Sequence, residues 1–374
     1  MIYKKILLLA HDGEDFYKAR IPFAKFLIQN GFQVFVVVPK DKYTQAIIDE
    51  GLTVFNGSLE RDNLNPFDLL RTIFQVRSYA RDNQIDLVHS FKFIPNLINV
   101  LSNLFASRKV VLHIAGLGIA FANNSFKYLV IRNIFRLLFF FQFLRANLVI
   151  IQNPDDFNDF YFKDFFRKKI KVVKGSGVDI QRFNPVNRKT VSTGKLTFLC
   201  TTRLIWEKGI AEMAEAFSSL SGQLKTQTEL IIIGEPDVKN PRAVTPEFIA
   251  KYQGSAVVRF VGKKERIQDY LNNADVFILP SYYREGIPRS ILEALASGLP
   301  VITTTVPGCN LTVKDGKNGF MIEPRSSLAI KNAVEKMIAQ RASWPEMGAY
   351  SRELAVTEFS ENTVFGQIVN LYHS

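Results

Sequence analysis

The sequence predicts an α/β protein made of two doubly wound domains, each built on a parallel sheet. Short continuous runs of Val, Ile and Leu alternate with longer helical patterns, which is typical of strands buried on both faces of a parallel sheet. The chain has 374 residues, enough for two to three domains of roughly 150 residues. Its hydrophobic content of 47% is ordinary for a globular protein.

The expected strands fall into two groups, one in each half of the chain. Helical patterns fill the intervals between them, and a terminal helix is expected over 363–372. The strands are expected at 6–10, 34–38, 87–90, 110–114, 148–152 and 170–173 in the first half, and at 196–201, 230–233, 257–261, 276–279, 301–303 and 320–322 in the second.

The domain boundary is expected where polar residues and turn-forming Gly, Asn and Pro interrupt this alternation, around 174–194. An α/β domain is expected on each side of it, and the C-terminal helix could pack back towards the first. The predicted parts are an N-terminal domain over 1–180, a linker over 181–194, a C-terminal domain over 195–360 and a helix over 361–374.

No segment is expected to be cleaved or to span a membrane. The apolar run at 6–10 is too short for a signal peptide, and charges within 126–144 leave only 137–144 uncharged, where a span needs about 20 residues. Cys200 and Cys309 cannot form a disulfide framework, and no Cys/His spacing fits zinc. We therefore expect a cytoplasmic protein with no metal site.

The chain is strongly basic, with 47 Lys and Arg against 35 Asp and Glu, a net charge of +12 and a pI near 9.5. This excess indicates a partner with negative charge, whether nucleic acid, anionic lipid or a phosphorylated small molecule. Residues 87–154 hold seven cations and no acidic side chain, so this region is expected to face an anionic or apolar surface. It has no nucleic-acid-binding motif, which disfavours nucleic acid as the partner.

The sequence lacks the usual loops for dinucleotides and for metal-bridged nucleotides. Gly116-Leu117-Gly118 is followed by Phe121 where the dinucleotide fingerprint has its third glycine. No Walker loop and no Asp-x-Asp triplet occurs. A diphosphate is therefore expected to be held by side-chain cations, backbone amides and helix N-termini, without a metal ion.

Two cations follow the expected strand at 196–201. Arg203 and Lys208 precede Gly209, which permits close backbone approach at a helix start. Cations at a strand end beside a helix N-terminus favour an anion site. For these residues alone, an ordinary solvated loop stays the alternative.

A second loop follows the strand at 276–279 and introduces two carboxylates eight residues apart, Glu285 and Glu293. Ser290 is expected to cap the helix that begins there, with amides pointing at a phosphate. Eight helical residues span about 12 Å, beyond the roughly 5–9.5 Å between the carboxyl groups of glycoside hydrolases. The pair is better suited to hold the hexose and the ribose of one nucleotide sugar. A loop Glu and a solvated helix Glu are the alternative.

Together these residues resemble the retaining glycosyltransferases of family 4 over nearly the whole chain. Glu285-x7-Glu293 is similar to the family signature, and Arg203 and Lys208 match its diphosphate-binding pair. Further positions resemble the interdomain linker of the family, and others its CapM-like and PglA-like branch, which acts on undecaprenyl-diphosphate-linked sugars. The linker matches are Gly177-Val178-Asp179, Arg182-Phe183 and Pro185, and the branch matches are 115–118 with Phe121, 152–156, 307–309, Asp315-Gly316 and Asn318-Gly319.

The resemblance implies a GT-B fold, in which two Rossmann-like domains face a central cleft, with the donor site in the second. It implies Arg203, Lys208 and Glu285 as catalytic residues, with Glu285 at the hexose, Glu293 at the ribose and the two cations on the leaving diphosphate. No protein base and no metal cofactor are then required. Further donor-binding residues implied are Gly234, Val261, Gly262, Gly286, Ile287, Pro288, Ser290 and Ile291.

The resemblance places the acceptor side in the first domain. Arg20 follows the branch pattern, and we expect it either to contact an acceptor phosphate or to form a surface ion pair. Lys92 lies near the position of a lysine in related sequences, and His113 ends a strand near the expected cleft, where it could touch the donor sugar. Gly116 and Gly118 lie in the loop that follows.

We therefore expect a metal-independent, retaining enzyme that moves a hexose or N-acetylhexosamine from a UDP-sugar to a sugar on undecaprenyl diphosphate in bacterial glycan biosynthesis. It is expected at the cytoplasmic face of the inner membrane as a peripheral protein. The alternatives are a nucleotide-sugar epimerase, or a phosphorylase or other GT-B enzyme, because fold does not fix chemistry. A nucleic-acid-binding protein is the non-enzyme alternative.

The segment 126–145 is the expected contact with an anionic membrane surface. Arg132 and Arg136 stand four residues apart and so share a helical face, with Phe135 and Phe139 turned elsewhere. A basic and aromatic surface without acidic residues is typical of a helix that lies on anionic lipid. A core helix whose arginines only reach solvent is the other interpretation.

Overall fold

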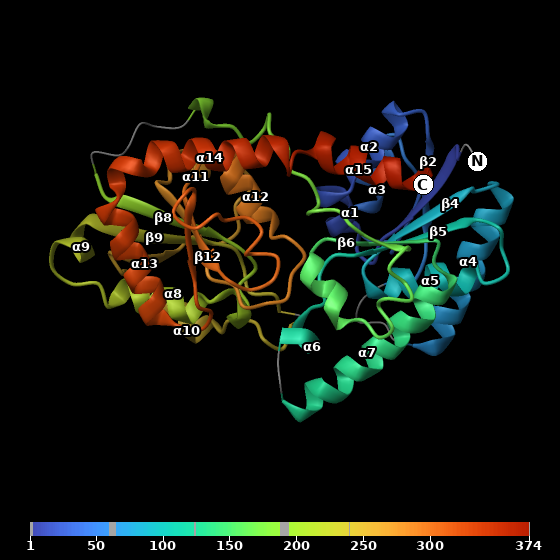
Figure 1. Cartoon of the computed structure of the whole chain (residues 1–374), viewed down its shortest axis with the longest axis horizontal. Helices are drawn as coiled ribbons and strands as arrows, with labels where there is room; N and C mark the ends of the chain where they lie inside the picture. The colour runs from blue at the N-terminus through green and yellow to red at the C-terminus, as the bar shows by residue number, and fades with distance from the viewer. Residues whose placement is uncertain (1–2, 60–64, 123–124, 188–193, 239, 374) are drawn as a thin grey trace. The chain divides into compact units, whose positions relative to one another are not determined.

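The chain forms two compact units. Unit 1 consists of residues 1–176 and 361–374, and unit 2 of residues 177–360. Each unit has a parallel sheet with helices packed against it (Figure 1), so the predicted class of two doubly wound α/β domains is confirmed. The computed structural model describes residues 3–59, 65–122, 125–187, 194–238 and 240–373.

Unit 1 is built on a seven-stranded sheet with the order β3-β2-β1-β4-β5-β6-β7. All neighbouring strands are parallel, and the order reverses between β1 and β4. In sheets of this class, ligands bind at the carboxyl ends of the strands where the order reverses. The strands are β1 Lys5–Leu9, β2 Gln33–Val38, β3 Thr53–Asn56, β4 Leu87–Phe91, β5 Lys109–Ile114, β6 Leu148–Ile151 and β7 Ile170–Val172.

Several helices of unit 1 begin at polar capping residues. The Asp12 carboxylate accepts a hydrogen bond from the Asp15 amide at 2.8 Å, and the Asn65 side chain accepts one from the Phe67 amide at 3.0 Å. The helices are α1 Gly13–Ala19, α2 Ile21–Gln29, α3 Thr44–Asp49, α4 Pro66–Asp82, α5 Phe93–Ser102, α6 Ile119–Ala122, α7 Phe126–Arg145, the 3₁₀ helix η1 Pro154–Asp159 and α15 Glu361–His373.

The last helix, α15, packs into the core of unit 1. Phe365 lies beside Phe23, with ring centroids 5.2 Å apart. The buried Tyr372 hydroxyl and His89 Nδ1 are hydrogen-bonded at 2.6 Å. The Lys109 ammonium donates to the Tyr372 carbonyl at 2.7 Å, so it satisfies the C-terminal end of the helix.

α7 packs on unit 1 through the side that carries Arg132 and Arg136. Arg132 Nε donates to the Ala120 carbonyl at 3.1 Å, and Arg136 donates to the Asp159 carbonyl at 2.7 Å and pairs with the carboxylate of the same residue at 3.2 Å. Phe139 is buried in the same helix. The expectation that these arginines form an outward basic face is wrong, because backbone carbonyls and an acidic side chain of unit 1 bind them.

Unit 2 is built on a six-stranded parallel sheet with the order β10-β9-β8-β11-β12-β13, which reverses between β8 and β11. Every strand expected from the sequence is present, with ends shifted by at most two residues. The strands are β8 Leu196–Thr201, β9 Thr228–Ile233, β10 Val258–Phe260, β11 Val276–Leu279, β12 Val301–Thr304 and β13 Gly319–Ile322. The helices are α8 Ile210–Ser218, α9 Gly222–Gln227, α10 Pro246–Ala250, α11 Ile267–Asn273, α12 Arg289–Ala296, α13 Ser327–Ala339 and α14 Trp344–Thr357, with the 3₁₀ helices η2 Pro185–Asn187, η3 Trp206–Lys208 and η4 Arg341–Ser343.

Unit 2 begins before the linker expected at 181–194. The Arg352 guanidinium donates to the carbonyls of Ile180, Phe183 and Ala296 at 3.0, 2.8 and 2.8 Å, which ties the start of the unit to α12. The described part of the expected linker therefore belongs to unit 2, and residues 188–193 lie outside the described residues.

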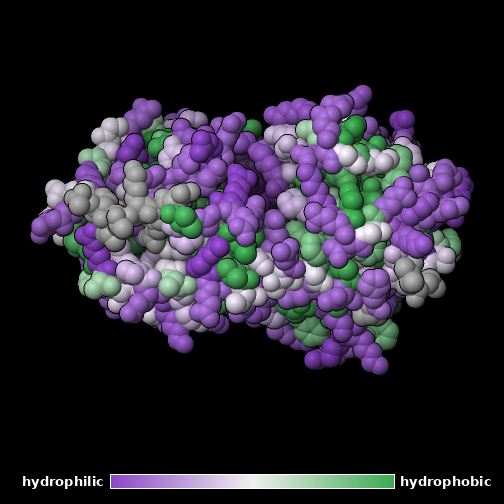
Figure 2. Space-filling view, turned by 90° about the horizontal axis from the view of Figure 1, so that it is seen from above, coloured by the Kyte–Doolittle hydropathy of each residue, from purple (hydrophilic) through white to green (hydrophobic). Residues whose placement is uncertain are grey.

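The face seen in Figure 2 is largely hydrophilic, broken by separate hydrophobic patches.

Candidate active site

Lys208 and Glu285 come together where the strand order of unit 2 reverses. Lys208 ends η3, which follows β8, and Glu285 lies in the loop after β11. β8 and β11 are parallel neighbours. Two residues singled out from the sequence, 77 positions apart, therefore meet at the edge of the sheet where this fold binds ligands.

Close backbone packing brings these loops together. Gly209 has a φ of +74°, and a Cβ there would lie 2.5 Å from the carbonyl oxygen of Pro280. A Cβ on Gly308 would lie 1.8 Å from the carbonyl oxygen of Gly286. Only glycine permits either approach, so a larger residue at either position would push the loops apart.

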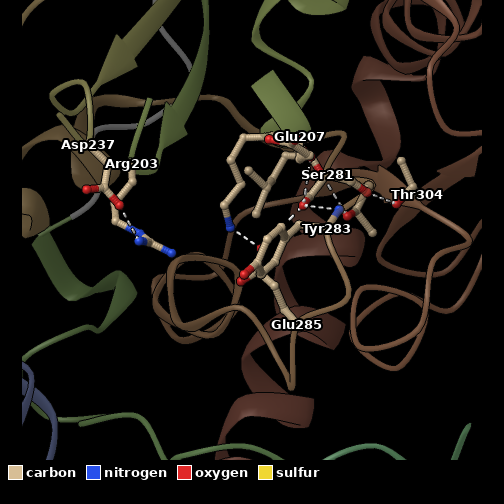
Figure 3. Close-up of polar contacts among 10 residues, drawn as sticks. Arg203, Glu207, Asp237, Ser281, Tyr283, Glu285 and Thr304 are labelled. Atoms are coloured by element: carbon tan, nitrogen blue, oxygen red, sulfur yellow. Dashed lines mark hydrogen bonds and ion pairs between the residues drawn. The ribbon is translucent and has the colours of Figure 1, made fainter. Parts of the chain in front are cut away.

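The Lys208 ammonium forms an ion pair with the Glu285 carboxylate (Figure 3). The two side chains are 7% and 19% exposed, so the pair is largely shielded from water. The Ser281 hydroxyl lies 3.3 Å from Glu285 Oε1 and donates a hydrogen bond to it. Removal of one partner would leave a charge that is poorly solvated. Chemically, the pair offers a cation to a phosphate and a carboxylate to sugar hydroxyls.

Residues that the sequence analysis missed hold the loop after β11. The Glu207 carbonyl accepts from the Tyr282 amide at 2.8 Å, and the Thr304 hydroxyl donates to the Ser281 carbonyl at 2.5 Å. The Glu207 carboxylate is 6% exposed and accepts from Arg242 Nε at 2.7 Å. Figure 3 shows Glu207, Ser281 and Thr304 on the same side of the site. For Ser281 and Thr304, the sequence offers one signal that could have found them: each is a polar residue at or just after the end of an apolar strand.

Arg203 does not take part in the ion pair between Lys208 and Glu285. Its guanidinium binds the Asp237 carboxylate at 2.7 Å, and the two side chains are 55% and 20% exposed. In Figure 3, Arg203 and Asp237 lie to one side of Ser281 and Glu285. Asp237 follows β9 and was missed as well, although an acidic residue shortly after a strand end is a recognisable signal. An exposed guanidinium can exchange such a partner for a phosphate.

α12 begins directly after this loop, without the side-chain cap expected from Ser290. Pro288 occupies the N-cap position, and no side-chain hydrogen bond caps the helix. The expectation for Ser290 is therefore wrong, because the helix begins at Arg289 and Ser290 already lies within its first turn. The Ile291 amide bonds to the Pro288 carbonyl at 3.1 Å, so it is not an available donor. Gly286, Ile287 and Pro288, which end the loop, are buried.

Glu293 is half-buried in α12, whereas Glu285 lies before the helix begins. The axial separation of about 12 Å, which assumed one continuous helix, therefore does not apply. Burial raises the pKa of Glu293, and the charges of Arg289 and Arg182 oppose that rise. A carboxylate in such surroundings gains from new hydrogen-bond donors, such as two neighbouring hydroxyls.

The other predicted donor-side residues lie at the carboxyl ends of β9 and β10. The Gly234 amide donates to the Gly262 carbonyl at 3.1 Å, and the Val261 amide donates to the Ile232 carbonyl at the same distance. Because the strands are parallel, these residues share the sheet edge that carries Lys208.

Arg20 and Lys92 lie where the strand order of unit 1 reverses. Arg20 is 6% exposed, and its guanidinium carbon lies 4.3 Å from the centroid of the Phe91 ring, so the interpretation as a surface ion pair is wrong. Lys92 pairs with Asp15 at 3.1 Å. Burial alone would raise the pKa of Asp15, but the charges of Lys92, Arg20 and His11 hold it well below its usual value.

His113 is buried at the end of β5, with 1% of its surface exposed. Its Nε2 lies 3.2 Å from the Gln152 amide nitrogen, and its ring stacks on His89 with centroids 5.5 Å apart. Burial lowers the pKa of His113 to about 3, and a neighbouring arginine adds to the effect. A neutral ring packed in this way argues against direct contact with a sugar. Gly116 and Gly118, in the next loop, are both half-buried.

Two features are absent from the described parts of the chain. No three His, Cys, Asp or Glu side chains there gather in a way that could hold a metal ion. Within the same residues, no helix has the length and apolar character needed to cross a membrane.

Two family models match the chain, one in each unit. The model described as Glycosyl transferase 4-like matches residues 5–153, and the model described as Glycosyl transferases group 1 matches residues 184–354. The second match contains Lys208, Glu285 and Glu293, and the first contains Arg20 and Lys92.

Curated relatives of similar length carry related descriptions. The N,N'-diacetylbacillosaminyl-diphospho-undecaprenol alpha-1,3-N-acetylgalactosaminyltransferase of Campylobacter jejuni is 26% identical, and the match covers 98% of each chain. The UDP-Gal:alpha-D-GlcNAc-diphosphoundecaprenol alpha-1,3-galactosyltransferase of Escherichia coli is 23% identical, and the match covers 78% of this chain and 76% of that enzyme.

Solved structures share the two-domain fold. A glycosyltransferase from Rickettsia africae superposes with a TM-score of 0.79 at 18% identity, covering 100% of this chain and 98% of that one. Anabaena HepE, in complex with UDP and glucose, has a TM-score of 0.78 at 18% identity, covering 99% of this chain and 100% of that one. The two matched regions span most of the chain, which belongs to the glycosyltransferases that join a glycosyl transferase 4-like domain to a group 1 domain in a GT-B fold.

Proposed function

We propose that this glycosyltransferase moves a hexose or an N-acetylhexosamine from a UDP-sugar to a sugar carried on undecaprenyl diphosphate, with retention at the anomeric carbon. The observation that carries the proposal is the shielded Lys208–Glu285 pair at the strand-order reversal of unit 2. The acceptors named for the Campylobacter and Escherichia relatives, and the UDP bound to the Anabaena protein, support this choice of substrates.

On the donor side, the diphosphate takes the place of Glu285 as the partner of Lys208. The released carboxylate then accepts hydrogen bonds from hexose hydroxyls, while Glu293 binds the ribose. Arg203 exchanges Asp237 for a phosphate oxygen. Because Lys208 is shielded from water, its charge acts strongly on the negative charge that grows on the leaving diphosphate.

The chemical step then needs no protein base. The bond between the anomeric carbon and the phosphate oxygen breaks, and the acceptor oxygen bonds to the same face of that carbon. The acceptor proton passes to the leaving phosphate oxygen, so the diphosphate is both leaving group and base. The protein contributes fixed cations and a fixed sugar orientation.

On the acceptor side, Arg20 and Lys92 bind the diphosphate of the lipid-linked sugar. Both lie at the carboxyl ends of the strands of unit 1, the edge at which α/β sheets bind ligands. A polyprenyl acceptor places the reaction at a membrane, so the enzyme works as a peripheral protein at the cytoplasmic face.

Two measurements test this function. UDP-, GDP- and ADP-sugars are compared for the rise in melting temperature that a ligand of the folded state produces. The stabilising sugar is then incubated with a short-chain polyprenyl-diphosphate sugar, and the anomeric configuration of the product is read by NMR. We expect stabilisation by UDP-sugars and a product that keeps the donor configuration. Conversion of the UDP-sugar without acceptor would identify an epimerase instead, and an inverted product would overturn the mechanism.

A further inference from the structure

One side of α7 exposes hydrophobic side chains along the whole helix. They recur every three or four residues and therefore lie on one face of a helix about 30 Å long. Soluble proteins seldom leave so long an apolar face in water. We call this face the α7 stripe, and it consists of Phe126, Val130, Ile134, Leu137, Phe141 and Leu144, which are 82, 44, 53, 51, 56 and 47% exposed.

The rest of the helix is fixed to unit 1, so the stripe cannot turn inward. Phe139 and Phe143 are buried in a cluster with Phe160, at centroid distances of 5.3 and 5.0 Å. Arg132 and Arg136 bind carbonyl groups of the same unit, as described above. The fixed face leaves the apolar side as the one that any partner would meet.

Neighbouring segments extend this apolar surface. Phe162 is 69% exposed, and its ring lies 5.2 Å from that of Phe140 on α7. At the last residue of α7, the Arg145 guanidinium donates to the carbonyls of Asn103 and Ala106 at 2.8 Å each. This contact brings the turn that carries Phe105, which is 87% exposed, to the end of the helix.

The charged side chains of α7 itself are all positive. α7 has no acidic residue, and Lys127 is exposed at its first turn. Lys168 is exposed close in sequence to Phe165, which is itself 75% exposed, and the exposed Arg167 beside it forms a surface ion pair with Asp164 at 2.7 Å. Apolar side chains flanked by cations match the layers of an anionic bilayer, in which acyl chains lie beneath negative head groups.

We infer that the α7 stripe inserts into the acyl boundary of an anionic membrane, with the nearby cations at the head groups. Insertion of apolar side chains contributes most to this contact and the cations contribute less, whereas the spacing of the arginines in the sequence predicted the opposite. The inference rests on the proposed function in one respect, because a polyprenyl acceptor makes a bilayer the relevant surface.

A flotation experiment tests the inference on the full chain. The stripe variant carries Ile134→Gln, Leu137→Gln and Phe141→Gln. The control variant carries Val186→Gln, Val238→Gln and Leu328→Gln in unit 2, where these side chains are 85, 89 and 65% exposed. Vesicles of phosphatidylglycerol and phosphatidylcholine are used at low and high salt.

We expect the wild type and the control variant to float with the vesicles, with part of the binding kept at high salt. The stripe variant should need at least about tenfold more lipid, because it loses apolar area that leaves water on insertion. Melting temperatures of the three proteins should agree, because the changed side chains are exposed. Flotation of the stripe variant like the wild type would overturn the inference.

A second copy of the chain is the competing occupant of the stripe. Sedimentation equilibrium would then show a dimer that the stripe variant breaks while vesicle binding stays unchanged, and this result would also overturn the inference. Transfer to a water-soluble acceptor analogue is measured in parallel. If it is absent in the wild type while the stripe still governs vesicle binding, the proposed function fails and the membrane contact stands.

Discussion

At the scale of single residues, the burial of Lys208 sets the effect of removing it. Lys208→Ala should lower turnover by about 10²–10³, the usual loss when one preorganised charge contact to a transition state is removed. Arg203→Ala should cost less, because its guanidinium is 55% exposed and screened by water. Steady-state kinetics with the donor measure both. Lys195→Ala is the control, since this lysine lies at the other end of β8. Wild-type rates in both variants would refute the site.

Neutralising Glu285 and neutralising Glu293 should affect substrate binding in different ways. Glu285→Gln should change discrimination among UDP-sugars, because this side chain is placed at the hexose. Glu293→Gln should weaken UDP and all UDP-sugars alike, because it is placed at the ribose. Calorimetric titration with UDP and with the true donor separates the two effects. Loss of UDP binding in Glu285→Gln alone would reverse the roles.

Burial of His113 predicts a pH dependence of stability. Its pKa is about 3 in the folded chain, against 6.5 for an ordinary histidine. Between these values the unfolded chain binds the additional proton, so the stability contributed by the neutral ring is complete above pH 6.5 and is lost as the pH falls towards 3. When the pH is lowered from 7 to 5, the free energy of unfolding of His113→Gln should therefore fall by less than that of the wild type.

Urea unfolding at the two pH values measures this difference. His373→Gln is the matched control, because His373 is exposed at the end of α15. An equal pH dependence in the wild type and in His113→Gln would contradict the burial of a neutral ring.

Residue spacing singled out the candidate site residues but not the groups that hold them. Arg203, Lys208, Glu285 and Glu293 stand out because they follow expected strand ends in a recognisable order. The groups that hold the site come from other strands: Asp237, the partner of Arg203, follows β9, and Thr304, which binds the Ser281 carbonyl in the loop that carries Glu285, ends β12. Which strand ends lie side by side depends on the strand order, which periodicity does not contain.

At the scale of elements, continuous apolar runs located the buried strands to within two residues. β3 was not predicted, because it lies at the edge of its sheet, where two of its four residues are exposed and the run of apolar residues is interrupted. The orientation of α7 was predicted wrongly for a different reason. This helix has apolar residues on both sides, so its pattern does not tell which side faces the protein, and contacts with Asp159 and Ala120 decide it.

The attachment of α15 can be tested through one hydroxyl group. Tyr372→Phe removes a buried hydrogen bond and leaves His89 Nδ1 without its partner, which should lower the free energy of unfolding by about 1–3 kcal/mol. Tyr161→Phe is the control, because its hydroxyl bonds to Asn133 at the surface and should matter by less than about 0.5 kcal/mol. Equal losses in urea unfolding would mean that the buried bond does not anchor the helix.

At the scale of the whole molecule, cations of the chain are proposed to neutralise the diphosphate without a metal ion. Turnover should therefore change by less than about twofold when EDTA removes divalent cations. The assay compares rates with EDTA and with added magnesium. A rate abolished by EDTA and restored by magnesium would show that the side chains alone do not bind the leaving group.

The return of α15 to unit 1 has a consequence for biosynthesis. A ribosome completes all of unit 2 before it makes residues 361–373, and at roughly 5–20 residues per second this takes about ten to forty seconds. During that interval the apolar surface that Phe365, Ile368 and Tyr372 later cover stays exposed. The first domain to be synthesised is thus the last to be finished, and its early segment needs protection from aggregation while the nascent chain grows.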